Sequence, residues 1–217
     1  MYTPRFNRIT DRAVLIEAMQ AYPFAILFGP QSGSEAAPMT ATHLPLVVKD
    51  KGPHGLLEGH FARANRHWKA LAGRESLVVF SGPHSYISPT LYVDPLSVPT
   101  WNYIAVHAYG TLELVEDEAG KDALLSALIR AHEPGFEAKW RGMPDEFRRS
   151  MLAEIVGFRI PIARIEGKFK LSQNRDEAER SNIQAAQAVG TPDQQALAGW
   201  MARLERIVSL DTCNELY

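Results

Sequence analysis

Cysteine is almost absent from this sequence of 217 residues. Cys213 stands alone near the end of the chain, which excludes an internal disulfide and a zinc site built on cysteines. A chain with one cysteine fits a reducing compartment, and we expect a cytoplasmic protein. Long apolar runs are missing as well. No stretch approaches the roughly 18 residues that a membrane span requires, and residues 1–8 have no signal-peptide core.

An excess of positive charge is also missing. The formal net charge is −2 and the pI is about 6.4. Proteins that bind nucleic acid through their overall field are usually basic, so any DNA contact here needs a local patch. Arg141, Arg148 and Arg149 form the best local cluster, although a solvated helix face explains it more simply. Neither a helix-turn-helix pattern nor a basic arm is visible.

Several common catalytic motifs do not occur. There is no Gly-x-Gly-x-x-Gly turn, no P-loop and no Gly-x-Ser-x-Gly, and residues 31–34 (QSGS) do not fit the last of these. These absences argue against Rossmann, nucleotidase and hydrolase sites. No two histidines have His-x-x-x-His spacing. His43, His60 and His84 could share a metal or a haem only if the fold brought them together.

What the sequence does contain is a series of strand-like segments. They span residues 24–28, 40–48, 56–62, 76–80, 101–115 and 158–171. Residues 29–38 and 81–99 read as loops, and Pro45 predicts an edge, a bulge or a cavity border within the second strand. Mostly consecutive strands with short connections predict a largely antiparallel β fold with flanking helices (α+β), arranged as a barrel.

Helices are predicted at the start, in the middle and at the end of the chain. Their periodicity covers residues 11–22, 64–71, 118–131 and 145–155, and the tail is helical. Leu197, Trp200, Met201 and Leu204 form an apolar stripe that covers the barrel or joins a dimer contact. We therefore expect a barrel with inserted helices over residues 1–175 and a helical extension over residues 176–217, packed on the barrel or on a dimer partner.

Five segments carry polar groups that a plain barrel does not need: residues 41–46, 59–65, 80–89, 98–103 and 166–174. In the first, Thr42 and Leu44 share one face of a strand and His43 and Pro45 the other. In the second, Arg63, Asn65 and backbone N–H groups suit a phosphate. The ordinary explanations are a histidine whose hydrogen bonds are satisfied within the fold, a surface arginine and an asparagine that caps a helix.

The remaining three segments suggest a flat, charged ligand. Hydroxyls crowd residues 80–89 and either bind a ligand or stabilise a loop. Trp101 and Tyr103 flank Asn102, which suits a flat ring or an aromatic plug at a barrel end. Lys168 and Lys170 share one strand face, where a common anion or a solvated edge would explain them.

Taken together, these segments resemble the PaiB family of FMN-binding negative transcriptional regulators. The matching stretches, in order, are residues 1–4 (MYTP), 22–24 (YPF), 41–45 (ATHLP), 59–65 (GHFARAN), 82–89 (GPHSYISP), 98–103 (VPTWNY) and 167–174 (GKFKLSQN). Each stretch is short, but their order and spacing make the resemblance specific. It covers roughly residues 1–175.

The resemblance implies an FMN-binding split β-barrel, a fold related to pyridoxamine phosphate oxidases, with FMN between the two subunits of a homodimer. Within this picture residues 42–45 meet the flavin ring and residues 60–65 approach the phosphate. Trp101, Asn102 and residues 168–174 close the site, from the same or the second subunit. The implied cofactor-binding set is Thr42, His43, Leu44, Pro45, His60, Ala62, Arg63, Asn65, Tyr86, Ser88, Trp101, Asn102, Lys168 and Gln173.

Three functions stay open at this point. The first is an FMN-binding repressor. The second is a flavin-dependent oxidoreductase that uses NAD(P)H, with His43, His60 or Tyr86 as proton donor. The third is a non-catalytic flavin or haem-handling protein. The sequence departs from the family pattern at Leu91, where an aromatic is expected before Tyr92, and after Asn174, where the tail is long and rich in Ala and Gln.

Overall fold

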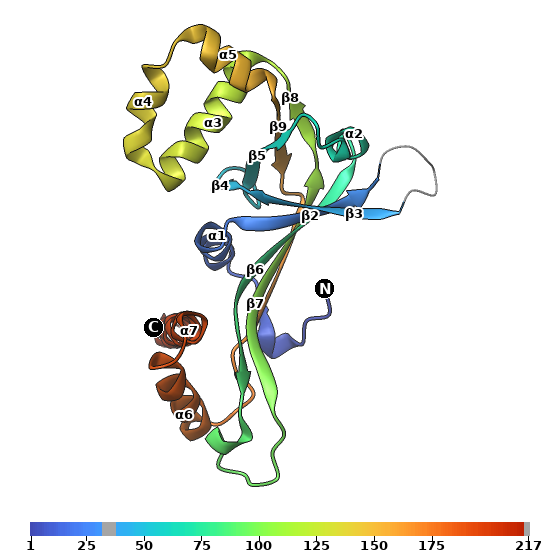
Figure 1. Ribbon diagram of the computed structural model, residues 1–217. Helices are drawn as coiled ribbons and strands as arrows, with labels where there is room; N and C mark the ends of the chain where they lie inside the picture. The colour runs from blue at the N-terminus through green and yellow to red at the C-terminus, as the bar shows by residue number, and fades with distance from the viewer. Residues whose placement is uncertain (32–37, 215–217) are drawn as a thin grey trace. The chain divides into compact units, whose positions relative to one another are not determined.

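The computed structural model describes residues 1–31 and 38–214, with side chains as far as Arg206. Its antiparallel strands form two sheets, of order β1–β10–β7–β6–β2–β3 and β4–β5–β9–β8 (Figure 1). The strands are β1 (Arg8–Ile9), β2 (Phe24–Pro30), β3 (Met39–Pro45), β4 (Val47–Lys49), β5 (Leu56–Ala62), β6 (Glu75–Ile87), β7 (Thr100–Thr111), β8 (Glu113–Val115), β9 (Ile155–Pro161) and β10 (Arg164–Lys170).

Helices flank these sheets, as predicted for an α+β protein. They are α1 (Arg12–Ala21), α2 (His67–Leu71), α3 (Glu118–His132), α4 (Glu137–Arg141), α5 (Asp145–Ala153), α6 (Glu177–Ala188) and α7 (Pro192–Asn214). None of the helices in the described part of the chain is long and apolar enough to cross a membrane.

The chain divides into two compact units. The larger contains residues 10–80 and 106–166, and the smaller contains residues 1–9, 81–105 and 167–217. Strands β6, β7 and β10 pass from one unit into the other along the chain. The smaller unit is thus assembled from three separate parts of the sequence, including its beginning and its end.

The larger unit is built on helix α1 and on the long pairing of β5 with β9. The Asp11 carboxylate caps α1 by accepting hydrogen bonds from the backbone N–H groups of Ala13 and Val14. In the β5–β9 pair, Gly59 lies opposite Phe158, whose ring contacts Phe61 with a centroid distance of 4.9 Å. Both rings are fully buried and form the centre of this core.

Pro45 ends a strand at a sheet edge, as its missing N–H predicted. Strand β3 stops at Pro45 and is the last strand of its sheet, and β4 begins at Val47 in the other sheet. Between them the backbone N–H of Leu46 donates to the Pro23 carbonyl at 2.9 Å. The single strand predicted over residues 40–48 is therefore two strands.

Other predicted boundaries were wrong. Residues 81–87 were predicted as a loop, yet they continue β6, because buried and exposed positions keep alternating as far as Ile87. The strand predicted over 101–115 breaks at Leu112, and the one over 158–171 breaks at residues 162–163. There the N–H of Ile162 bonds to the Gly55 carbonyl, beside β5, and the N–H of Ala163 bonds to the Tyr109 carbonyl of β7, so the chain changes its partner. Most of the predicted loop 29–38 lies outside the described residues.

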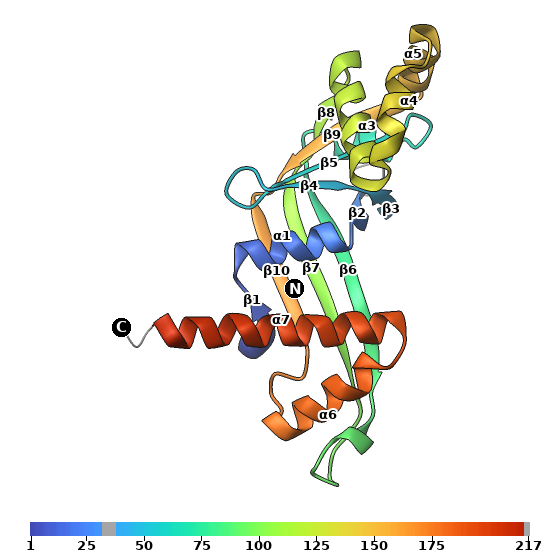
Figure 2. The same ribbon diagram turned by 90° about the vertical axis from the view of Figure 1, so that its left-hand side faces the viewer.

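In the smaller unit, helices α6 and α7 cover one face of the strands, and the N-terminal segment lies on the other side (Figures 1 and 2). Trp200 of α7 meets Phe169 of β10 edge to face, with 5.3 Å between ring centroids. Leu197 and Met201, which belong to the predicted stripe, are buried within the single chain. This stripe is therefore an intramolecular cover.

A close backbone approach in the larger unit generates the first prediction. A Cβ built on Gly110 would clash with the backbone carbonyl of Pro161 and with the Ile160 side chain. We expect Gly110→Ala to lower the free energy of unfolding by about 1–3 kcal/mol, because backbone cannot yield as a flexible side chain can. Urea unfolding measures the change. Gly135→Ala is the matched control, since nothing lies within 4 Å of its Cβ position, and equal stability of the two variants would contradict the prediction.

Candidate functional site

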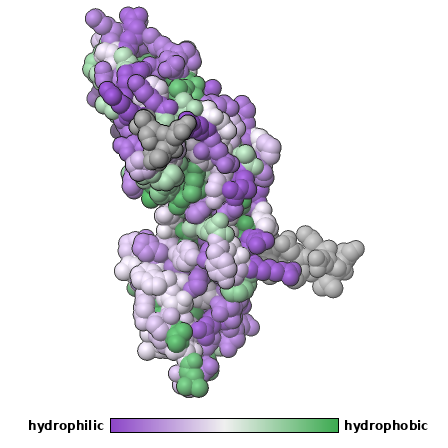
Figure 3. Space-filling model, turned by 90° about the vertical axis from the view of Figure 1, so that its right-hand side faces the viewer, coloured by the Kyte–Doolittle hydropathy of each residue, from purple (hydrophilic) through white to green (hydrophobic). Residues whose placement is uncertain are grey.

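One face of β6, β7 and β10 in the smaller unit carries aromatic rings and lysines. Side chains two residues apart share a strand face, so each strand contributes a pair. These pairs are His84 and Tyr86, Trp101 and Tyr103, and Lys168 and Lys170. We call these six residues the aromatic face. Figure 3 views this side, where much of the surface of this unit is pale, neither strongly polar nor strongly apolar.

Contacts between side chains tie the aromatic face together. The Trp101 ring lies 6.0 Å from the His84 ring and 6.2 Å from the Tyr86 ring, between centroids. The Lys168 ammonium lies 5.3 Å from the centre of the Tyr103 ring and 5.4 Å from that of Tyr2. Tyr86 and Trp101 remain 50% and 51% exposed. Two large rings left half in water are unusual for a surface that has no ligand or partner.

The opposite face of the same strands is buried and includes Asn102. This residue has no exposed surface, and its Oδ1 accepts a hydrogen bond from the Ser172 hydroxyl at 3.1 Å. Its Nδ2 has no partner in the described structure. Trp101 and Asn102, predicted together, therefore point to opposite faces, and only Trp101 belongs to the aromatic face.

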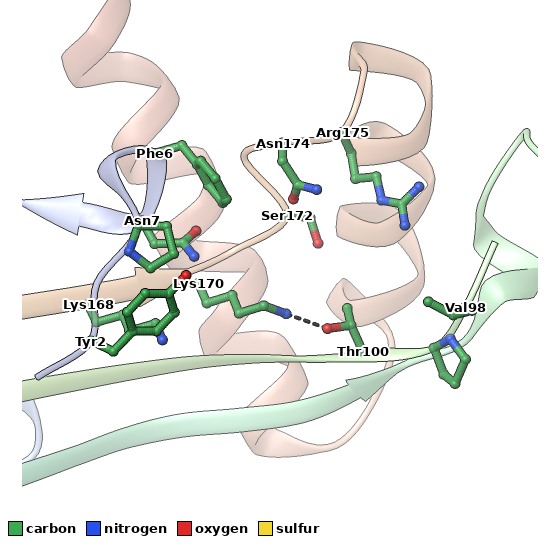
Figure 4. A pocket seen from close by; sticks show the side chains of 12 residues that line it. Tyr2, Phe6, Asn7, Val98, Thr100, Lys168, Lys170, Ser172, Asn174 and Arg175 are labelled. Carbon is green, nitrogen blue, oxygen red and sulfur yellow. Dashed lines mark hydrogen bonds between the residues drawn. The ribbon is translucent and has the colours of Figure 1, made fainter.

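The turn after β10 is held in a conformation that most residues avoid. Ser172 has φ of 63°, in the left-handed region. Gln173 clamps the turn: its Oε1 accepts from the Leu171 N–H at 2.7 Å and its Nε2 donates to the Phe169 carbonyl. The amide of Gln173, predicted to contact the cofactor, is thus used on the backbone. This clamp directs Asn174 and Arg175 toward a neighbouring cavity (Figure 4).

This cavity has a volume of about 290 Å³. Figure 4 shows Lys170 reaching across it toward Thr100, with Phe6 and Asn7 on one side and Asn174 and Arg175 on another. It is lined by Tyr2, Pro4, Phe6, Asn7, Val98, Pro99, Thr100, Lys168, Lys170, Ser172, Asn174 and Arg175. The lining contains three cationic side chains and no carboxylate.

The two lysines of the cavity differ in their surroundings. Lys168 is only 9% exposed, and its ammonium lies over the rings of Tyr2 and Tyr103. Lys170 donates to the Thr100 hydroxyl and, at 2.6 Å, to the Trp101 carbonyl. The pKa of Lys170 is lowered by burial and, after that, by the positive charges of Lys168 and Arg175. Strand β10 lies between β7 and the short strand β1, which pairs with Gly167 and Lys168, so a solvated edge does not explain Lys168.

A second polar cluster lies in the larger unit, where β3, the end of β5 and α2 meet. The Thr42 hydroxyl is 2.8 Å from Nδ1 of His67 and accepts from Nδ2 of Asn65 at 3.3 Å. The Asn65 Oδ1 accepts from the His67 backbone N–H at 3.1 Å. Thr42 and Asn65 were predicted for this site, and His67 was missed. The sequence signal that could have indicated His67 was its position two residues after Asn65.

The other predicted residues of the larger unit lie on or next to this cluster. Arg63 uses Nε and Nη2 to bind the carbonyls of Ala153 and Ile155, at 2.5 and 3.0 Å. It therefore holds the start of β9, and only Nη1 is left for a ligand. Leu44 is buried, Pro45 and His60 are half-buried, and His43 and Ala62 are exposed. In the smaller unit the hydroxyl of Ser88, also predicted, bonds to Thr90.

Two further hypotheses concern charged residues. Within the described residues no group of three or more His, Cys, Asp or Glu side chains could hold a metal ion. The arginine cluster is largely neutralised: Arg141 binds the Asp122 carboxylate at 2.7 Å, and Arg148 binds Asp145 at 2.5 Å. A helix face with paired charges explains the cluster without DNA.

Comparison with known proteins identifies the family. Residues 1–164 match the family described as "Putative FMN-binding domain". The "Protease synthase and sporulation protein PAI 2" of Bacillus subtilis is 35% identical over 187 residues, which cover 84% of this chain and 87% of that protein.

Solved structures share the fold. The FAD and heme binding protein from Mycobacterium smegmatis has a TM-score of 0.59 and 19% identity, over 82% of this chain and 80% of that one. The flavocytochrome Anf3 from Azotobacter vinelandii also has a TM-score of 0.59 and 19% identity, over 83% and 78%. The fold is thus a split β-barrel, as predicted. The chain belongs to the PaiB-type family of FMN-binding proteins.

The described residues fit FMN chemically. An isoalloxazine ring needs flat apolar surface, which the half-exposed ring of Trp101 provides, with the half-exposed Tyr86 ring edge-on beside it. Its phosphate needs donors with positive charge, and both Lys168 and the Nη1 of Arg63 qualify. The hydroxyl of Thr42 adds an uncharged hydrogen-bonding group.

The buried histidine of β5 generates a pH prediction. Burial holds the pKa of His60 below its ordinary value of 6.5. As the pH falls, the unfolded chain takes up this proton first, so the contribution of His60 to stability is present above about pH 6.5 and is lost as the pH falls through its lower folded-state pKa. We expect the free energy of unfolding to fall between about pH 7.5 and 5, and to fall less in His60→Leu. Denaturant titrations at both pH values measure this, and an equal fall in both proteins would contradict it.

Proposed function

We propose that this protein is an FMN-binding regulator of the PaiB type that holds its cofactor at a homodimer interface. The observation that carries the proposal is the aromatic face, with its half-exposed rings beside lysines that have no carboxylate partner in the described part of the chain. Membership of an FMN-binding family supports the cofactor. The relationship to a sporulation protein of Bacillus subtilis supports a regulatory role.

The openness of the aromatic face supports the homodimer. A flat ring laid against Trp101 and Tyr86 would keep its other side in water within a single chain. The cavity of about 290 Å³ lies at the lower end of the roughly 300–1,000 Å³ range of ligand pockets, so it does not enclose a whole flavin nucleotide. A second copy of the chain would cover the exposed ring and complete the site.

Within this proposal each residue has a limited role. Trp101 and Tyr86 provide surface for the ring, Lys168 places positive charge beside it, and Thr42 and Asn65 are held in place by His67 for polar contacts. Bound FMN supplies one- and two-electron chemistry. The regulatory role rests on the relationship to the family and not on a DNA-binding surface, because Arg141 and Arg148 of the best arginine cluster are paired with carboxylates. Repression would then involve a protein partner or a DNA contact made by the dimer.

The test is cofactor retention by the purified protein, read from its absorption spectrum after addition of FMN and desalting. We expect flavin bands to stay with the wild-type protein. Lys168→Met and Arg63→Met should each weaken FMN binding by about 1.5–3 kcal/mol if the charged group contacts the phosphate. Trp101→Leu should weaken it through lost ring surface. Lys139→Met is the control, because Lys139 contacts only the Phe136 ring among the described residues.

The outcomes separate the functions that the sequence left open. Retained flavin that reduced nicotinamides bleach would favour the oxidoreductase, and a Soret band would favour haem handling. Retained flavin that stays oxidised, with a dimer in light scattering, supports the proposal. If the wild-type protein binds no flavin, the proposal is wrong. If only the lysine or only the arginine matters, that residue marks the phosphate.

A further inference from the structure

The cavity beside the aromatic face has features that FMN binding does not account for. Of its twelve lining residues, four lie in the stretch 168–174 that the family resemblance places at the FMN site (Lys168, Lys170, Ser172 and Asn174), and the other eight do not. Its cations all lie between residues 168 and 175, beyond residue 164, where the match to the FMN-binding family ends. Its other wall is the N-terminal segment, at Tyr2, Pro4, Phe6 and Asn7.

The charge in this cavity is unbalanced. The Lys168 residue is 9% exposed and its ammonium contacts two aromatic rings, but it has no carboxylate partner in the described part of the chain. The Lys170 ammonium donates two hydrogen bonds to neutral oxygens, which leaves one N–H for a ligand. Arg175 shares its charge with Glu179 at 3.4 Å, outside the lining. Burying like charges side by side is unfavourable unless an anion joins them.

An unsatisfied side chain also faces this space. Asn7 is 2% exposed and lines the cavity, and its side-chain Oδ1, a hydrogen-bond acceptor, has no partner within the described structure. A buried amide without a partner costs about 1–3 kcal/mol, so such groups are normally satisfied by a ligand or by water. Opposite it, the left-handed backbone at Ser172 is kept by the clamp of Gln173, which fixes Asn174 and Arg175 at the cavity. Strain of this kind gathers at ligand sites.

The geometry points to a second anion site in this cavity, which binds a tetrahedral dianion such as a phosphate group while FMN is bound elsewhere. Lys170 and Arg175 neutralise the charge beside Lys168, and the Asn174 amide donates to the oxygens. The volume corresponds to about ten water molecules at roughly 30 Å³ each, enough for phosphate or a small phosphate ester. Such a ligand would bridge the N-terminal segment and the end of β10, which makes it suited to be an effector of a regulator.

The experiment is calorimetric titration of the FMN-saturated full chain with inorganic phosphate and with phenyl phosphate, at low ionic strength. We expect both to bind, and Lys170→Met to lower the affinity about tenfold or more through loss of a charged donor. Asn174→Glu places a carboxylate at an exposed position of the lining, and should lower the affinity at least as much without disturbing the core. Lys139→Met should leave the affinity unchanged. Circular dichroism confirms the fold of each variant.

The two probes distinguish the source of the anion. Tighter binding of phenyl phosphate supports the site and identifies an ester with an apolar body, whereas equal binding supports it and identifies the free anion. Absence of heat with either probe, or unchanged affinity in both variants, overturns the proposal. Binding that occurs without FMN but disappears when FMN is added also overturns it, because the cavity then holds the cofactor's own phosphate. If the protein holds no FMN, the same titrations of the FMN-free chain still decide whether the anion site exists.

Discussion

The two-residue period of three strands governs the smaller unit. Because successive side chains of β6, β7 and β10 alternate between faces, one set of residues packs beneath α6 and α7 while the other set remains outside. The buried set is anchored by the ring contact of Phe169 with Trp200 and by the hydrogen bond of Ser172 to Asn102. The side chains of the outer set are aligned because the buried set holds the three strands in register. A register slip of one residue would bury the lysines and expose the phenylalanine, so the apolar core also sets the chemistry of the outer face.

Local patterns predicted much of this arrangement. The predicted helix at residues 11–22, Pro45 as a strand end and the alternation of residues 168–171 all depend on near neighbours, and the structure confirms the helix, the edge and the shared face of the lysines. The N-terminal wall of the cavity was not predictable, because nothing in residues 2–7 encodes which distant strand they will cover. The continuation of β6 through residues 81–87 was not predicted, because the glycine and prolines in residues 82–89 are typical of a loop.

Residue type predicted where polar side chains lie better than it predicted which groups those side chains bind. Arg63 and Gln173 are the residue types that bind phosphates and carbonyl edges, yet both donate hydrogen bonds to backbone carbonyls. Lys168, Asn7 and the amide nitrogen of Asn102 keep unused capacity. Where a donor's hydrogen bond goes is decided by tertiary packing, and a sequence pattern holds little information about it. The aromatic face emerged only when contacts joined three strands that are far apart in the chain.

The division of the smaller unit among three parts of the sequence has a consequence for biosynthesis. Residues 1–9 are synthesised well before the residues of β10 that they pair with, Gly167 and Lys168, and before the helices that cover the sheet. The larger unit, complete by that point, is able to form first. Until α7 emerges, Phe169 and its neighbours have no cover, and closing the first residues onto β10 spans almost 160 residues of chain. The growing chain therefore passes through a stage in which its larger unit is folded and its ligand face does not yet exist.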